Sequence, residues 1–327
     1  MYNGTKVLDV HGHVSAPPEW MAYGALLLAA NGPARPLQIP DERLEASQQM
    51  HLKVMDERSV DVQLVGPRPF ASFQWARPHI QALWARATND TIARVVQMYP
   101  DRFVGMAFLP QSAELDTSSC VPELERCVKE MGFVGAYLNP DPSGRQQVPG
   151  LNESYWFPLY EKAQQLNVTL MVHPTAILDK RVECLNANYQ IANVIEEYLA
   201  TQILSRTDVF DRFPSLRVVV CHCGGSLDRW IKTDPHMGQK DLSANLFFDS
   251  CAHDVSFLTA AIEQRGVDQM LFGTEAPGSG GALRPETGRP ADDLVPVIAG
   301  LGILSEADKI KIFNTNAKKV FPQLARF

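Results

Sequence analysis

Short apolar segments rich in β-branched and aromatic residues alternate with helical patterns along the 327 residues of the chain. This order is typical of βα units around a parallel sheet. Eight such segments can be counted, and several, including LRVVVCH and VTLMVHP, are apolar almost throughout, as expected of strands buried on both faces. The sequence therefore predicts a (β/α)8 TIM barrel, with a doubly wound open sheet as the alternative.

The expected elements follow one another at regular intervals. The strands are expected at Val7–Val10, Val62–Val65, Phe103–Phe108, Phe133–Leu138, Val168–Val172, Leu216–Cys221, Leu246–Asp249 and Gln269–Phe272. The helical patterns cover Asp41–Arg58, Pro78–Met98, Tyr155–Leu166 and Gln190–Ser205. We expect a single barrel domain over residues 1–327, with long loops at about 15–40 and 277–290, lengths usual for functional lids or disordered segments.

Composition narrows the class of protein. The chain has 30 Lys and Arg against 37 Asp and Glu, a formal net charge of −7, which argues against binding a nucleic-acid backbone. No apolar stretch is long enough to span a membrane, and the first residues do not resemble a signal peptide. Six cysteines in so long a chain are expected as reduced thiols, so we expect a cytoplasmic protein.

Metal-type side chains stand at the ends of four expected strands. His11 and His13 close the first strand, where residues two apart project to one face. His173, His222 and Glu275 end the fifth, sixth and eighth strands. The carboxyl ends of all strands of a barrel meet on one face, so these five side chains are expected to converge. Imidazole nitrogen with carboxylate oxygen suits Zn²⁺ or a similar divalent ion.

The ordered set of motifs resembles the amidohydrolase superfamily. An H-x-H after strand one, a histidine after strand five, the His-Cys-Gly-Gly segment after strand six and an acid after strand eight carry the likeness, which spans almost the whole chain. Within that superfamily the chain resembles the amidohydrolase-2 group, which includes aromatic-acid decarboxylases and lactone hydrolases. The resemblance implies a (β/α)8 barrel that holds one divalent metal ion.

The acid after strand eight distinguishes branches of this group. Most members resemble G-x-D-x-P there, whereas this chain reads Gly-Thr-Glu-Ala-Pro around Glu275, as in the 4-oxalomesaconate hydratases of aromatic catabolism. The segments DVHGH, GPRP, LNAN and TGRPADD are similar to the same branch. This resemblance implies that His11, His13 and His173 are metal ligands. It also implies that Glu275 is a ligand or lies next to the metal, and acts as the general acid/base.

The residues themselves are compatible with three reactions. A zinc ion lowers the pKa of a bound water, and a neighbouring carboxylate can take its proton. Addition of that water to an alkene requires conjugation to a carbonyl, and His222 is the candidate acid that protonates the carbanion carbon. Lactone hydrolysis and the decarboxylation of a hydroxybenzoate-type acid need similar groups. We favour hydration of a small carboxylated intermediate of aromatic catabolism, with zinc expected and manganese as the alternative. The alternative that the chain is a scaffold protein without activity predicts that the metal site is incomplete, whereas no ligand position is missing in the sequence.

A carboxylated substrate needs cationic and polar partners. Arg68, in the GPRPF segment after strand two, is the first candidate because a guanidinium binds carboxylate through two parallel hydrogen bonds. The further substrate-binding candidates are Asn186, Tyr189, Arg229 on an expected helix after strand six, and His253. Exposed apolar residues on the outer helices would permit a homodimer.

Four other polar residues are expected to have structural roles rather than to contact the substrate. Asp9 is expected either to orient an imidazole or to hold the bottom of the barrel through a buried hydrogen bond. His51, His79 and His236 are expected on helix surfaces.

Overall fold

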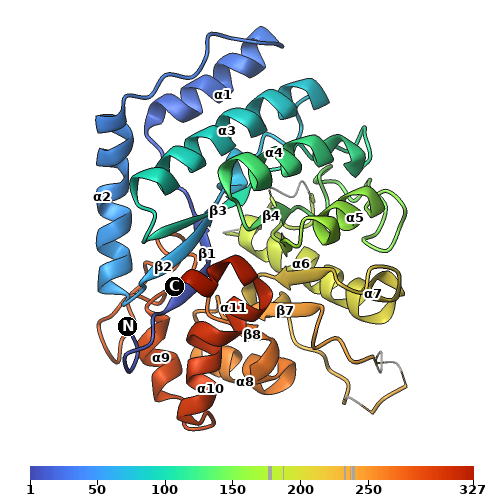
Figure 1. Cartoon of the computed structure of the whole chain (residues 1–327). Coiled ribbons are helices and arrows are strands. Elements are labelled where there is room, and N and C mark those ends of the chain that lie inside the picture. The colour runs from blue at the N-terminus through green and yellow to red at the C-terminus, as the bar shows by residue number, and fades with distance from the viewer. Residues whose placement is uncertain (176–178, 187, 232, 236, 238–239) are drawn as a thin grey trace.

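Eight parallel strands form one sheet in which neighbours in sequence are neighbours in space, in the order β1 to β8 (Figure 1). The computed structural model describes residues 1–327 except 176–178, 187, 232, 236 and 238–239. The strands are β1 (Leu8–His13), β2 (Val62–Gly66), β3 (Phe103–Ala107), β4 (Gly135–Leu138), β5 (Thr169–Val172), β6 (Arg217–Val220), β7 (Leu246–Asp249) and β8 (Met270–Leu271). All eight expected strands are confirmed.

The first and last strands meet and nearly close the sheet into a barrel. The amide of Val10 donates to the carbonyl of Phe272 at 2.9 Å, which joins β1 to the residue after β8. Strand β1 also runs three residues further than expected, because Gly12 and His13 still pair with Val65 and Gly66 of β2. The (β/α)8 barrel predicted from the sequence is therefore present, and the H-G-H motif lies within its first strand.

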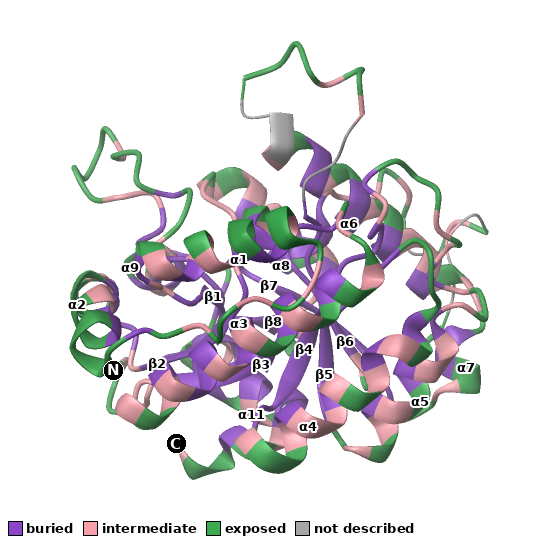
Figure 2. Cartoon of the chain, turned by 90° about the horizontal axis from the view of Figure 1, so that it is seen from above, coloured by how far each residue is buried: buried purple, intermediate pink, exposed green. Residues whose placement is uncertain are grey.

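Helices surround the sheet on its outside (Figure 2), where purple strands lie at the centre and the green outer faces of the helices point outward. They are α1 (Pro18–Ala30), α2 (Asp41–Glu57), α3 (Pro78–Met98), α4 (Val121–Met131), α5 (Phe157–Gln165), α6 (Asn188–Arg206), α7 (Val209–Arg212), α8 (Val255–Arg265), α9 (Leu294–Gly300), α10 (Glu306–Ile310) and α11 (Asn316–Val320). The four expected helices correspond to α2, α3, α5 and α6, with small differences at their ends.

The expectation of a long loop at residues 15–40 was wrong for half of the segment, because Pro18–Ala30 form α1. The helix begins with Pro18 at a position that favours proline, and its Ala- and Leu-rich sequence has high helix propensity. Trp20 and Leu27 are buried, and the Trp20 ring lies 4.8 Å from that of Trp84 on α3. In contrast, residues 277–290 contain no helix or strand, only an isolated bridge.

The apolar core has two layers, as a barrel requires. One layer lies between the strands and the helices, and includes Trp84, Trp156 and Phe313. The other fills the interior of the barrel, where alternate strand residues such as Val10, Met171 and Phe247 point inward. Residues of α11 and the turn after it close the amino-terminal end of this inner layer, so the opposite, carboxyl-terminal end is the one left open for a site.

His51 is buried, contrary to the prediction that it lies on a helix surface. Its side chain is on the inward face of α2, which also carries Leu44, Gln48 and Met55, and only 1% of it is exposed. The spacing of these residues follows the helical repeat, so the phase of α2 places His51 against the barrel. His79 is exposed, as expected, and His236 lies outside the described residues.

The buried His51 should make stability depend on pH. Burial lowers the pKa of His51 to about 4, whereas an unfolded histidine titrates near 6.5. Above pH 6.5 both states are neutral, and as the pH falls from 6.5 to 4 only the unfolded chain gains the proton. We expect this residue to remove about 3 kcal/mol of the free energy of unfolding over that range. Urea unfolding of the apoprotein at pH 7.5 and 4.5 should show the loss, His51→Gln should reduce it, and the exposed-site variant His79→Gln should not.

No helix among the described residues is long and apolar enough to cross a membrane. The six cysteines are all free, and five of them are buried.

Candidate metal centre

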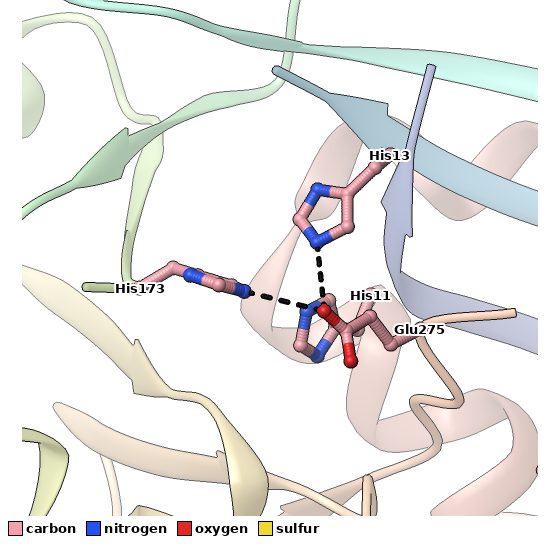
Figure 3. A group of neighbouring side chains, drawn as sticks. All are labelled: His11, His13, His173 and Glu275. Carbon is pink, nitrogen blue, oxygen red and sulfur yellow. Dashed lines mark hydrogen bonds and ion pairs between the residues drawn. The ribbon is translucent and has the colours of Figure 1, made fainter. Parts of the chain in front are cut away.

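Four side chains from distant parts of the chain meet at the carboxyl-terminal end of the barrel (Figure 3). His11 and His13 come from β1, His173 directly follows β5, and Glu275 follows β8. One nitrogen or oxygen atom of each lies within 4.8 Å of one such atom of every other. The convergence of strand ends that the sequence predicted therefore brings these residues into a single cluster.

The outer nitrogen of each imidazole is held by a hydrogen-bond acceptor. His11 Nδ1 lies 2.8 Å from Asp249 Oδ2, His13 Nδ1 lies 2.8 Å from the carbonyl of Pro67, and His173 Nδ1 lies 2.8 Å from that of Pro174. Because each partner is an oxygen that accepts, each Nδ1 must carry the proton and donate it. The three Nε2 atoms are therefore left as lone pairs, which is the usual arrangement around a metal-binding histidine.

Among the described residues, no donor satisfies these lone pairs. The Nε2 atoms of His11 and His173 are buried and make no hydrogen bond to any described residue, and that of His13 faces Glu275 Oε1 at 3.2 Å. Two acceptors at that distance repel unless a cation lies between them. Burial lowers the pKa of His11 and lowers that of His13 to about 3, so both imidazoles stay neutral. Three imidazoles that each present Nε2, together with one carboxylate, fit a divalent metal ion.

Glu275 is held in an unusual backbone conformation. Its φ is +57°, in the left-handed region that few residues other than glycine adopt, and its amide donates to the carbonyl of His11 at 2.9 Å. Its second oxygen, Oε2, accepts from Ser279 Oγ at 3.1 Å.

His222 lies near Oε2 of Glu275, whereas His13 and His173 lie near Oε1. Its Nδ1 is 2.7 Å from Oε1 of the fully buried Glu197, and its Nε2 is 3.6 Å from Glu275 Oε2. Burial opposes a charge on the imidazole, but the Glu197 carboxylate outweighs it and raises the pKa of His222 well above its ordinary value. A charged His222 donates from both nitrogens, so its Nε2–H points toward the carboxylate of Glu275.

A cavity of about 690 Å³ opens beside this cluster, a size typical of small-molecule sites. His13, His173, His222 and Glu275 are among the polar residues that line it. The other residues around it are Arg68, Pro69, Phe70, Gln190, Asn193, Val194, Gly225, Cys251, Ala252, His253, Phe257, Pro277, Gly278 and Ser279. The cavity therefore combines the metal-type cluster with one guanidinium and several apolar side chains.

Arg68 is the one Lys or Arg among the described residues that line this cavity. Its Nε donates to the carbonyl of Val14 at 3.2 Å, and its guanidinium makes no ion pair with any described residue. Burial lowers the pKa of Arg68, although Glu275 nearby favours the charged form. An arginine that is mostly buried without a carboxylate partner is suited to bind an anionic ligand.

The other candidates for substrate contact are placed differently. His253 lines the cavity, and its buried Nε2 has no hydrogen-bond partner among the residues that the structure describes. Asn186 is exposed and does not line the cavity, and the side chain of Tyr189 lies outside the described part of the chain. Arg229 is exposed, with its guanidinium 4.3 Å from the centre of the Trp230 ring. The helix expected around it was wrong, because the described residues between β6 and β7 contain a 3-10 turn at His222–Gly224 but no α-helix.

Sequence reasoning missed two acids that orient the histidines. Asp249 is the last residue of β7, a signal of the kind used for the other strand ends, and it orients His11. Glu197 lies within α6 and has no comparable signal. Asp9 neither orients an imidazole nor holds the bottom of the barrel: its carboxylate accepts from the backbone amides of His11 and Thr274 beside the metal centre.

The sequence model of the amidohydrolase family matches residues 8–323, nearly the whole chain. The chain belongs to the amidohydrolase family. A 2-keto-4-carboxy-3-hexenedioate hydratase from Sphingobium sp. is 34% identical over 97% of this amidohydrolase and 96% of the relative. The crystal structure of 4-oxalomesaconate hydratase from Rhodopseudomonas palustris is similar, with a TM-score of 0.85 and 31% identity, and covers 98% of this chain and 97% of that one.

Decarboxylases share the fold. A dihydroxybenzoic acid decarboxylase from Polaromonas sp., solved with bound manganese and 2-nitroresorcinol, has a TM-score of 0.69 and 24% identity, and covers 99% of this amidohydrolase and 100% of that chain. The metal-dependent hydratases and decarboxylases of this family thus share one barrel, and relatives named as hydratases match this chain over almost its full length.

Proposed function

We propose that this amidohydrolase is a metal-dependent hydratase that adds water to an activated double bond of a small carboxylated compound, such as 4-oxalomesaconate. The observation that carries the proposal is the pairing of two groups in one cavity. The carboxylate of Glu275 and the imidazole of His222 lie 3.6 Å apart, beside three metal-type imidazoles and an arginine that has no carboxylate partner among the described residues. Hydration needs one group that accepts a proton from water and another that donates a proton to carbon.

The metal is held by His11, His13 and His173 through Nε2, together with Glu275. We propose zinc, because imidazole and carboxylate are its usual ligands, with manganese as the alternative tested by reconstitution. When bound, the ion supplies Lewis acidity that acidifies water and polarises a substrate oxygen. Asp249 and the carbonyls of Pro67 and Pro174 hold the three rings in the required tautomer.

Glu275 and His222 move the protons. Glu275, which lines the cavity, takes the proton of the attacking water, while the new carbon–oxygen bond forms and the alkene electrons move toward the conjugated carbonyl. His222 donates its Nε2 proton to the adjacent carbon, and Glu197 holds the ring in place through Nδ1. The proton on Glu275 then returns to His222 across 3.6 Å, so the cycle adds one water and restores both groups.

Arg68 binds a substrate carboxylate, which predicts a large effect on binding. We expect Arg68→Met to lower kcat/KM by roughly 10²-fold, mainly through KM, because a charge-assisted pair in a mostly buried site contributes about 1.5–3 kcal/mol. Steady-state kinetics with the carboxylated substrate should show this. The control variant Arg86→Met, on the exposed outer face of α3, should retain wild-type kinetics. An unchanged KM for Arg68→Met would contradict this role.

The proposed function is tested with zinc-loaded and manganese-loaded enzyme and 4-oxalomesaconate, by following the loss of the conjugated absorbance. Loss that requires the metal supports hydration. A metal-loaded enzyme that leaves 4-oxalomesaconate unchanged but releases CO₂ from a dihydroxybenzoate, or opens a lactone, contradicts hydration and supports one of the two alternatives that the sequence left open.

A further inference from the structure

A chain of buried polar side chains connects the metal centre to helix α2. It starts at Asp9 in β1, passes through Gln63 in β2 and ends at His51 in α2, and all three side chains are fully or almost fully buried. None of them lines the cavity described above. The reaction needs none of them to touch the substrate, so their hydrogen bonds require another explanation.

The orientation of the Gln63 amide follows from its neighbours. Its terminal nitrogen lies 2.8 Å from Asp9 Oδ2 and 2.8 Å from the carbonyl oxygen of Ala276, and both partners accept hydrogen bonds. The NH₂ group must therefore be on that side, which leaves Oε1 facing His51 Nε2 at 2.7 Å. His51 consequently carries its proton on Nε2 and donates it, while its Nδ1 accepts from Ser15 Oγ at 3.2 Å.

At the end near the metal centre, this series of hydrogen bonds reaches the residues on both sides of Glu275. Thr274 donates its amide at 3.1 Å and its hydroxyl at 2.5 Å to the two oxygens of Asp9. The Thr274 hydroxyl also accepts from the amide of Ala276 at 3.0 Å, and Gln63 binds the carbonyl of Ala276. The residue between them, Glu275, has the positive φ described above. A strained conformation of this kind persists only when the surroundings hold it on both sides.

Gly12 shows how closely this chain is built into the metal site. A Cβ atom at position 12 would lie 2.4 Å from the Gln63 side chain, far below a permitted contact. Only glycine between His11 and His13 lets Gln63 cross from β2, past β1, to the end of β8. The glycine of the H-G-H motif thus leaves room for the Gln63 side chain, and it also separates the two histidines by one residue.

We propose that Gln63 and His51 are positioning residues that hold Glu275 in its left-handed conformation and so set its carboxylate at the metal centre. The inference rests on the proposed role of Glu275 as a metal ligand and general base. It also makes α2, outside the barrel, part of the support of the site. Outer residues that hold a ligand typically change metal affinity or activity 10–100-fold when replaced.

The test compares Gln63→Met and His51→Phe with wild type and with Thr169→Val. Methionine and phenylalanine keep approximately the size of the side chains but remove the hydrogen bonds. Thr169 is a matched control, since it is fully buried and its hydroxyl donates to the carbonyl of Val320 at 2.6 Å at the opposite end of the barrel. For each metal-free protein we would measure the melting temperature and the zinc dissociation constant by competition with a chelating dye, and then kcat and KM after loading.

We expect all three variants to melt at a lower temperature, but only Gln63→Met and His51→Phe to bind zinc 10–100-fold more weakly and to lose kcat with little change in KM. His51→Gln, which keeps a donor toward Gln63, should recover part of the affinity. Zinc affinities equal to those of wild type and Thr169→Val would overturn the inference while leaving the proposed function intact. If Gln63→Met does not fold, the zinc affinity and kcat of His51→Phe alone test the inference. A wild-type chain that binds neither zinc nor manganese would contradict both proposals.

Discussion

Replacing Glu275 by glutamine is expected to lower kcat of the hydration by roughly 10³-fold or more, the largest effect of a single substitution in this enzyme. Glutamine keeps the size of the side chain and one oxygen, but it cannot take a proton from water or return one to His222. The three imidazoles remain, so the variant should still bind metal, more weakly than wild type. Single-turnover and steady-state kinetics on metal-loaded protein would separate lost chemistry from lost metal.

The matched control for this variant is Glu196→Gln. Glu196 is also buried, and burial raises its pKa to about 6, but it does not line the cavity. The Glu196→Gln variant should retain kcat within about twofold of wild type, because residue 196 contacts no reacting atom. A Glu275→Gln enzyme as active as this control would exclude Glu275 as the base.

Removal of the metal is expected to abolish activity and to lower the stability of the folded chain. A ligand present at a thousand times its dissociation constant stabilises the native state by about 4 kcal/mol, and removal returns that amount. Calorimetry of chelator-treated and reconstituted protein would measure the difference in melting temperature. Reloading with zinc or manganese should restore both stability and turnover, and the more active of the two identifies the better cofactor.

Variants of the ligand shell should follow a definite order of metal affinity. His173→Ala removes a ligand and should weaken zinc binding more than Asp249→Asn, which only removes the carboxylate that orients His11 and should cost 10–100-fold. The exposed-site variant His79→Ala should bind like wild type. If Asp249→Asn bound zinc as weakly as His173→Ala, or His79→Ala also lost affinity, the assigned ligand set would be wrong.

The parts of the fold that could be predicted from the sequence depend on local pattern. Strand β6 was recognisable because Val218–Val220 form an unbroken apolar run, and the proposed ligands because each lies at or just after the end of an expected strand. His51 was misplaced because its burial depends on the phase of α2, which needs all of Leu44, Gln48 and Met55 to be considered together. Helix α1 was missed because its Ala- and Leu-rich sequence has a weak polar face, and glycines and prolines flank it.

The site was predictable only as far as strand ends reveal it. The proposed ligands can be recognised by their residue type, whereas the residues that hydrogen-bond to them can be recognised only in the folded structure. Asp249 becomes meaningful when β7 is placed near β1, and Glu197 when α6 is packed over the turn that carries His222. The positive φ of Glu275 also has no sequence signature, because the usual indicator, glycine, is absent at that position.

The two ends of the ligand set also lie at the two ends of the barrel sequence. His11 and His13 belong to the first strand to be synthesised, and Glu275 follows the last. A nascent chain that has not yet produced β8 has at most three of the four ligands and no neighbour for the free edge of β1. On the proposed ligand set, high-affinity metal uptake would report that the ring of strands is complete, and the ion would connect the first and the last part of the barrel to be synthesised.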